Sequence, residues 1–172
     1  LTPIFQNSSV DDSTTLTING GNFKSNEGSV IRNSTTSGNV VINNGNFNVY
    51  KVIDIWAALT TKEKSGTTVT VNGGTFNTTQ TAFSSSNFSG YHTLIINGGD
   101  ITSASSIIGY LGIYDEVIIK GGNLTYNGKD GGKAISVISG DLIIGEDDNK
   151  VKDDTPIINL NGGIIYVDEM EK

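Results

Sequence analysis

The chain contains no cysteine, a single histidine and a single arginine among its 172 residues. The lack of cysteine excludes a disulfide-bonded scaffold and thiol catalysis. Hydrophobic residues make up only 35% of the chain, and no apolar run approaches the ~20 residues that a membrane-spanning helix needs. The sequence therefore predicts no membrane span.

Charge is equally sparse. Charged residues account for 17% of the chain, and the net charge at pH 7 is −7. The eleven cationic residues are scattered, so no basic surface that could bind a phosphate backbone is expected, and nucleic acid is excluded as a partner. A compact globule of this size usually has more apolar residues. A thin, one-dimensional core needs fewer, so the composition favours an elongated fold.

What the chain does contain is a repeat. Residues 16–23, with the sequence LTINGGNF, recur as VVINNGNF at 40–47 and VTVNGGTF at 69–76. Weaker copies occupy 94–101 and 117–124, and 142–145 retain the strand alone. The copies start 24, 29, 25, 23 and 25 residues apart. Self-similarity at this period indicates a solenoid.

Each copy is typical of a β-strand, a sharp Asn-Gly-Gly turn and one further inward-facing apolar residue. In a parallel β-helix, equivalent residues of successive coils form rows spaced ~4.8 Å apart. Glycine follows the asparagine because the turn requires a positive φ. We therefore expect an inner row of Phe23, Phe47, Phe76, Ile101 and Leu124. At the turn we expect a hydrogen-bonded amide row of Asn19, Asn43, Asn72 and Asn97.

The predicted fold is all-β, a single-stranded parallel β-helix of six to seven coils of about 24 residues. It forms one domain over 1–172, with a cap or preceding coil at 1–15, regular coils at 16–144 and an acidic loop with a C-terminal coil or cap at 145–172. A chain that starts without methionine is expected to be a fragment of a longer protein. The competing interpretation is an antiparallel sandwich, because Asn-Gly between β-runs favours hairpins. The residues after the turn, one apolar and then polar, make a poor return strand.

The repeated unit, together with LIIGEDD at 142–148 ahead of TPII at 155–158, resembles the right-handed parallel β-helix repeats of large bacterial cell-surface proteins. These are the pectate-lyase-like or adhesin-type domains. The resemblance covers about residues 15–167 and is specific for a fold but weak for an activity. It implies a right-handed coil and a secreted, wall-anchored protein on the bacterial cell surface.

Enzymes that share this fold use clustered carboxylates, with a lysine or arginine base in the lyases. Here Asp54, Asp100 and Asp115 fall at different phases of the coil, whereas glycoside hydrolysis needs two carboxylates on facing surfaces. Arg32 and His92 are the only residues of their types, and His92 is expected in a loop. The sequence therefore predicts no catalytic residue and no cofactor.

Two sets of residues are candidates for binding a glycan. The position after each turn forms an outward row that could hydrogen-bond an extended glycan, although outward turn positions need only be polar in any case. We call these residues the outer row: Asn22, Asn46, Thr75, Asp100 and Asn123. The aromatic candidates for stacking on sugar rings, which could instead be buried beside apolar strands, are Trp56, Tyr91 and Tyr110.

The acidic loop offers oxygen ligands of the kind that Ca²⁺ prefers. It lacks the spacing of an EF-hand, and a solvated acidic loop explains the same residues, so no metal site is predicted. The weak candidates for ligands are Asp147, Asp148, Asp153 and Asp154.

Three functional hypotheses remain. The first is a non-catalytic structural or adhesive module of a bacterial surface protein, located outside the cell. The second is a carbohydrate-binding module on the same rod, and the third is a degenerate polysaccharide lyase or glycoside hydrolase. The expected partners are an extracellular glycan or a host surface protein, together with neighbouring domains of the parent chain.

Overall fold

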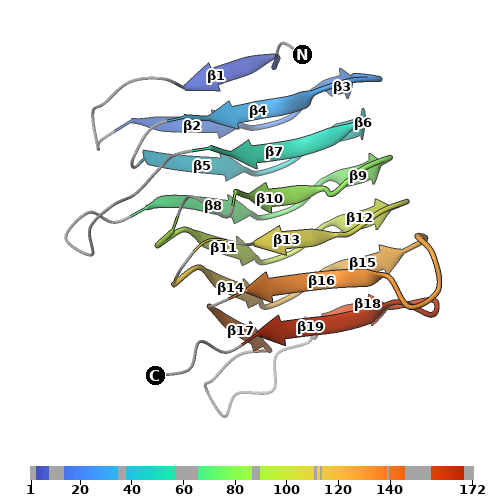
Figure 1. Cartoon of the computed structure of the whole chain (residues 1–172). Coiled ribbons are helices and arrows are strands. Elements are labelled where there is room, and N and C mark those ends of the chain that lie inside the picture. Colours follow the sequence, from blue (N-terminus) through green and yellow to red (C-terminus); the bar gives the residue numbers. More distant parts are fainter. Residues whose placement is uncertain are drawn as a thin grey trace.

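The protein is an all-β solenoid in which the described residues form strands and no helix (Figure 1). The computed structural model describes residues 3–7, 14–34, 38–56, 66–86, 90–110, 112, 114–138, 140–145 and 156–168.

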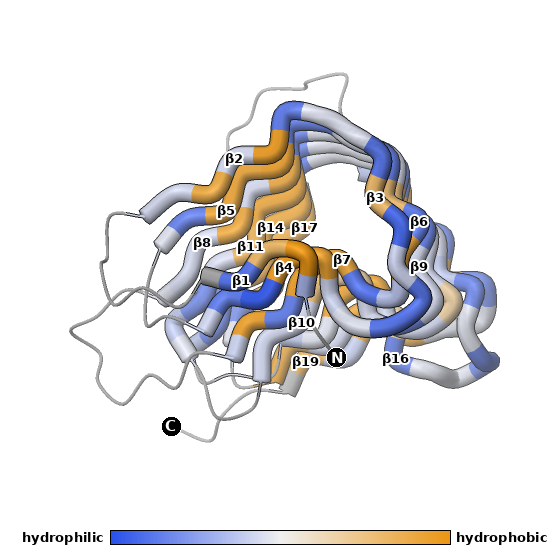
Figure 2. Tube along the Cα trace, turned by 90° about the horizontal axis from the view of Figure 1, so that it is seen from above, coloured by the Kyte–Doolittle hydropathy of each residue, from blue (hydrophilic) through white to orange (hydrophobic). Residues whose placement is uncertain are grey.

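The strands form three parallel sheets that surround a common interior (Figure 2). Sheet A contains β1 (Phe5–Asn7), β4 (Ser29–Asn33), β7 (Lys51–Ile55), β10 (Phe83–Ser85), β13 (Ile108–Tyr110), β16 (Lys133–Ile138) and β19 (Ile164–Asp168). Sheet B contains β2 (Thr15–Ile18), β5 (Gly38–Ile42), β8 (Thr67–Val71), β11 (Thr93–Ile96), β14 (Glu116–Ile119) and β17 (Asp141–Ile144). Sheet C contains β3 (Asn22–Lys24), β6 (Asn46–Val49), β9 (Thr75–Thr78), β12 (Asp100–Ser103), β15 (Asn123–Tyr126) and β18 (Ile157–Asn159).

Neighbouring strands within each sheet are three elements apart in the chain, as expected when every coil adds one strand to each sheet. All the strand pairs are parallel, so the antiparallel sandwich is wrong. In Figure 1 the strands of sheet A run to the left in front and those of sheets B and C run to the right behind, while the chain descends. The coil is therefore right-handed, the hand that parallel crossover connections almost always take.

The number of coils differs slightly from the prediction. The six strands of sheet B are separated by about five turns of about 25 residues each, fewer than the expected six to seven coils. The last Asn-Gly-Gly of the sequence does not mark a further coil. It lies between β18 and β19, where Asn161 and Gly162 both have positive φ, and so it turns the chain from sheet C into sheet A.

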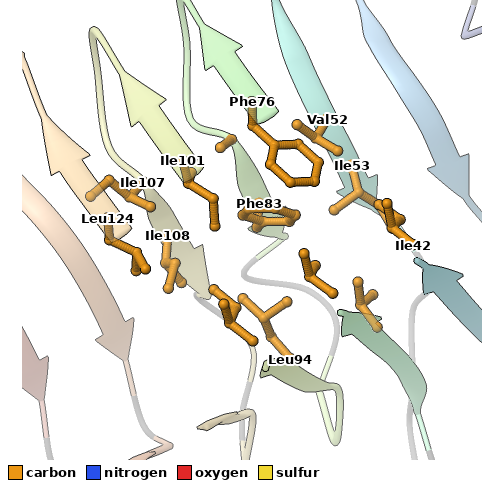
Figure 3. Packing of buried hydrophobic residues seen from close by; sticks show 14 of the residues in the cluster. Ile42, Val52, Ile53, Phe76, Phe83, Leu94, Ile101, Ile107, Ile108 and Leu124 are labelled. Carbon is orange, nitrogen blue, oxygen red and sulfur yellow. The ribbon is translucent and has the colours of Figure 1, made fainter. Parts of the chain in front are cut away.

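The inner row is confirmed. The rings of Phe23 and Phe47 stack with centroids 4.6 Å apart, and those of Phe47 and Phe76 with centroids 4.7 Å apart. Ile101 and Leu124 continue the row in the next two coils and are fully buried. Side chains of sheet A, including Phe83 and Ile108, pack against this row from the opposite side of the interior (Figure 3). Each such side chain contributes about 1.5–3 kcal/mol through burial.

The amide row at the turn is confirmed as well. The side-chain amide of Asn43 donates to the amide oxygen of Asn19 at 2.7 Å, Asn72 donates to Asn43 at 2.7 Å, and Asn97 donates to Asn72 at 2.8 Å. The row ends at the next coil, where Lys120 occupies the equivalent position, as the sequence indicated.

The glycine that follows lies very close to the coil before it. Gly74 has a φ of +113°, and a Cβ built there would lie 2.9 Å from the carbonyl oxygen of Gly45. That oxygen accepts a hydrogen bond from the backbone N–H of Thr75 at 2.8 Å, so it cannot move away without breaking the stack. A side chain is therefore excluded by both backbone conformation and space.

We predict that Gly74→Ala destabilises the protein by about 1–3 kcal/mol, because the new methyl group meets backbone and the left-handed conformation is strained. Chemical denaturation followed by circular dichroism measures the change. Gly20→Ala is the matched control, since Gly20 has no positive φ and no atom within 4 Å of a built Cβ. The free energy of unfolding of the Gly20→Ala variant should differ from that of the native protein by less than about 1 kcal/mol. Equal losses at the two positions would contradict this account of the turn.

Candidate functional site

The outer row lies on the outward face of sheet C, as predicted. Its five members are exposed and paired in register from coil to coil. The amide of Asn46 donates to the side-chain oxygen of Asn22 at 2.9 Å, and that of Asn123 donates to Asp100 at 2.8 Å. The next coil interrupts the row with the exposed, aliphatic Ile157. The polar stretch therefore spans five coils.

A shallow groove of about 510 Å³ follows the corner between sheets B and C. The glycines of the turns form its floor because they carry no side chains. The amide row lines one side through Asn72 and Asn97, and the outer row lines the other through Thr75, Asp100 and Asn123. We call this feature the corner groove; its walls offer hydrogen-bond donors and acceptors at regular spacing.

The three aromatic candidates lie in different places and do not join the outer row. Trp56 follows β7 at the end of sheet A and is 60% exposed. Tyr91 is half-buried just before sheet B, and its ring stacks on that of Tyr114 at 5.1 Å. Tyr110 is fully buried, and its position as a sugar platform is therefore wrong. It occupies an inward position paired with Val137 of the next coil, where its ring fills the core.

The carboxylates predicted to be out of phase are indeed separated. Asp54 lies on the outer face of sheet A, Asp100 on the outer face of sheet C, and Asp115 is buried just before β14. Within the described part of the chain no group of three or more His, Cys, Asp or Glu side chains could hold a metal ion. The weak calcium candidates Asp147, Asp148, Asp153 and Asp154 lie outside the described residues.

A buried polar cluster lies where the chain passes from sheet A to sheet B. His92 lies in the loop that precedes β11, as expected, but its side chain is fully buried. The ring Nδ1 of His92 accepts a hydrogen bond from the backbone N–H of Thr67 at 2.9 Å. The backbone N–H of His92 donates to Asp115 Oδ1 at 3.0 Å. The Ser85 hydroxyl at 2.5 Å and the Gly112 N–H at 3.0 Å donate to Asp115 Oδ2.

This cluster is built from equivalent positions of three consecutive coils, because Thr67 begins β8 while His92 and Asp115 immediately precede β11 and β14, one step before the paired residues Thr68, Thr93 and Glu116. Three donors satisfy the carboxylate, as burial of a charged group requires. Burial nevertheless raises the pKa of the Asp115 carboxyl, and the hydrogen bonds from Ser85, His92 and Gly112 oppose that rise. The pKa of the neighbouring Tyr110 hydroxyl lies well above its usual value, through burial first and the negative charge of Asp115 second.

The sequence carried only a weak signal of this cluster: polar residues at one coil position in an otherwise apolar strand pattern. The arrangement is not a nucleophile, base and acid in series, because His92 contacts Asp115 through its backbone N–H. We interpret the cluster as structural.

Comparison of the chain with known protein families, with curated proteins and with solved structures finds no match. The described residues contain no helix long and apolar enough to cross a membrane.

Asp115 makes the stability depend on pH in a defined direction. Its pKa is higher in the folded than in the unfolded state, where it is about 3.9, so the folded protein binds this proton more tightly. The stabilising contribution is therefore complete below the unfolded-state pKa and is lost as the pH rises through the folded-state pKa.

We predict that the stability of the native protein relative to Asp115→Asn falls as the pH rises above about 4. Urea unfolding of both proteins between pH 3 and pH 7 measures the difference, and a carbon NMR titration of the Asp115 carboxyl provides a second reading. A difference that is constant, or that grows with pH, would contradict the assignment.

Proposed function

We propose that the protein is a non-catalytic structural and adhesive module of a bacterial surface protein. The observation that carries the proposal is the in-register stacking of all three sheets. Continuous backbone hydrogen bonding along three faces makes a stiff rod, and the outward positions of sheet C present regular polar side chains. Such a rod suits the display of a surface at a distance from its anchor.

The extracellular setting and the wall-anchored parent protein belong to the same proposal. They are supported by the resemblance of the repeats to bacterial surface domains and by the low content of apolar and cationic residues. Neighbouring domains of the parent chain, and an extracellular glycan or a host surface protein, are the partners we infer.

The separation of Asp54, Asp100 and Asp115 supports a module without an active site. Hydrolysis of a glycosidic bond requires an acid and a base or nucleophile on either side of the bond. Asp54 and Asp100 lie on the outer faces of two different sheets, so no single sugar unit can contact both.

We expect no turnover when the protein is incubated with pectin, alginate or glycosaminoglycans. Reducing-end release and the absorbance of unsaturated products measure hydrolysis and elimination, respectively. Appearance of product in proportion to protein concentration would contradict the proposal and favour the degenerate polysaccharide-degrading enzyme.

Carbohydrate binding is a second candidate function, and the corner groove is the observation that favours it. Its floor of glycines lets a polymer approach the backbone, while Thr75 and Asp100 offer a hydroxyl and a carboxylate along one wall. The polar side chains along each wall repeat with every coil at ~4.8 Å, which suits an extended polymer lying along the rod.

If the corner groove binds a glycan, the double variant Thr75→Ala and Asp100→Ala should weaken binding about tenfold, since two hydrogen bonds of about 0.5–1.5 kcal/mol each are lost. A glycan array identifies the ligand, and calorimetry gives the affinities. Thr102→Ala is the matched control, because Thr102 lies on the same outward face of sheet C but does not line the groove. Silence of the array, or equal affinity of the double variant, would remove this candidate.

A further inference from the structure

The outer face of sheet A contains a second depression, separate from the corner groove. Asp54, Ser84, Gly109 and Ser136 occupy one outward column and are paired in register through β7, β10, β13 and β16. Gly109 contributes no side chain to this column, and a trough of about 440 Å³ lies there. The trough spans three steps between coils, roughly 14 Å along the rod.

One end of the trough is formed by an aromatic ring held in a fixed orientation. The indole N–H of Trp56 donates to Asp54 Oδ2 at 2.6 Å, and the guanidinium carbon of Arg32 lies 5.4 Å from the ring centroid. Asp54 Oδ1 accepts hydrogen bonds from Lys51 Nζ at 3.1 Å and from the Ser84 hydroxyl at 2.7 Å. The ring is therefore exposed yet positioned, as a platform for stacking requires.

The other end contains an unsatisfied hydroxyl. Ser136 lines the trough and is only 5% exposed, yet its Oγ has no hydrogen-bond partner among the described residues. Burial of a polar group without a partner is unfavourable, because the group loses its hydrogen bonds to water. A ligand that brings a hydroxyl or carboxylate into the trough would remove this cost.

The charge of the trough is the reverse of that of the whole chain. Among the described residues, Lys51 and Lys133 line it with Asp54 as the only carboxylate, whereas the chain carries a net charge of −7. Lys51 is paired with Asp54, which leaves Lys133 to attract an anion. Lys133 is exposed, and a cation–π contact positions its ammonium group, which lies 3.5 Å from the centroid of the Tyr166 ring.

We propose that this trough binds an acidic oligosaccharide. One sugar ring stacks on Trp56, ring hydroxyls bond to Asp54 and Ser136, and a carboxylate or sulfate group pairs with Lys133. The inference rests on the proposed non-catalytic adhesive function and names the class of ligand and the face of the rod that binds it.

The experiment uses the fact that Trp56 is the only tryptophan of the chain. Its fluorescence is titrated with a hyaluronan tetrasaccharide, which carries carboxylates, with a chondroitin sulfate tetrasaccharide, and with neutral chitotetraose. We expect a saturable change with at least one acidic probe and an affinity at least tenfold lower for the neutral one. Added salt at 0.5 M should weaken binding of the acidic probe, because the contact with the exposed Lys133 is screened.

Variants locate the binding site. Lys133→Gln and Ser136→Ala should each lower the affinity for the acidic probe about three- to tenfold. Gly109→Gln should abolish binding, because its side chain fills the trough. Ser29→Ala is the matched control, since the Ser29 hydroxyl is likewise buried and has no partner among the described residues, but it does not line the trough. Circular dichroism confirms that each variant is folded.

The inference would be overturned by no fluorescence change with either acidic probe, or by full binding in both the Gly109→Gln and the Ser136→Ala variants. Loss of binding in the Thr75 and Asp100 double variant, with the trough variants unaffected, would also overturn it and assign the ligand to the corner groove. Shortening of a probe during the titration would instead contradict the non-catalytic function, so the two failures are distinguishable.

Discussion

In-register hydrogen bonding between successive coils is the constraint on which the rest of this structure depends. The backbone N–H of Asn43 donates to the carbonyl of Ile18 at 2.8 Å, and Asn72 makes the same contact with Ile42 one coil later. Because this spacing is fixed, each residue lies directly against its equivalent in the coils before and after. Rows of identical side chains, the phenylalanine stack and the asparagine ladder, follow from that geometry, and so does the need for glycine where backbones approach most closely. One coil buries too few side chains to offset the ordering of its own backbone, so the coils are stable only together.

The same constraint determines what a site on this protein consists of. Side chains of one strand alternate between interior and solvent, so a surface is formed by columns of equivalent positions from different coils. The outer row and the trough are both such columns. Asp54, Ser84 and Gly109 come from three separate coils, and they become neighbours only because β7, β10 and β13 pair in register. Chemistry on such a rod is therefore distributed along its axis, which favours extended ligands over a compact substrate.

The interior tolerates polar residues where the rows let them satisfy one another. Thr67, His92 and Asp115 lie in consecutive coils, and the donors and acceptors of each meet those of the next. The sequence did not predict the burial of His92 and Asp115, because such side chains are rarely buried without partners. The partners come from coils 23 to 25 residues away, at distances that no local pattern reveals.

The sequence by itself determined the parallel coil, the inner row and the asparagine ladder. The turn motif recurs at a constant place relative to its strand. Parallel stacking of the coils in register is what brings Asn19 against Asn43 and Phe47 against Phe76. Only the tertiary structure decided that the residues after the turn form a third sheet, that Tyr110 and His92 are buried, and that Trp56 and Ser136 line opposite ends of one trough. The strands of sheet C have only one or two inward apolar residues each, and the hydrogen bonds between coils stabilise them where local strand preference does not. Which residues of sheet A face inward depends on the length and path of the segments between the turns. These segments vary from coil to coil and are not encoded in the repeated motif.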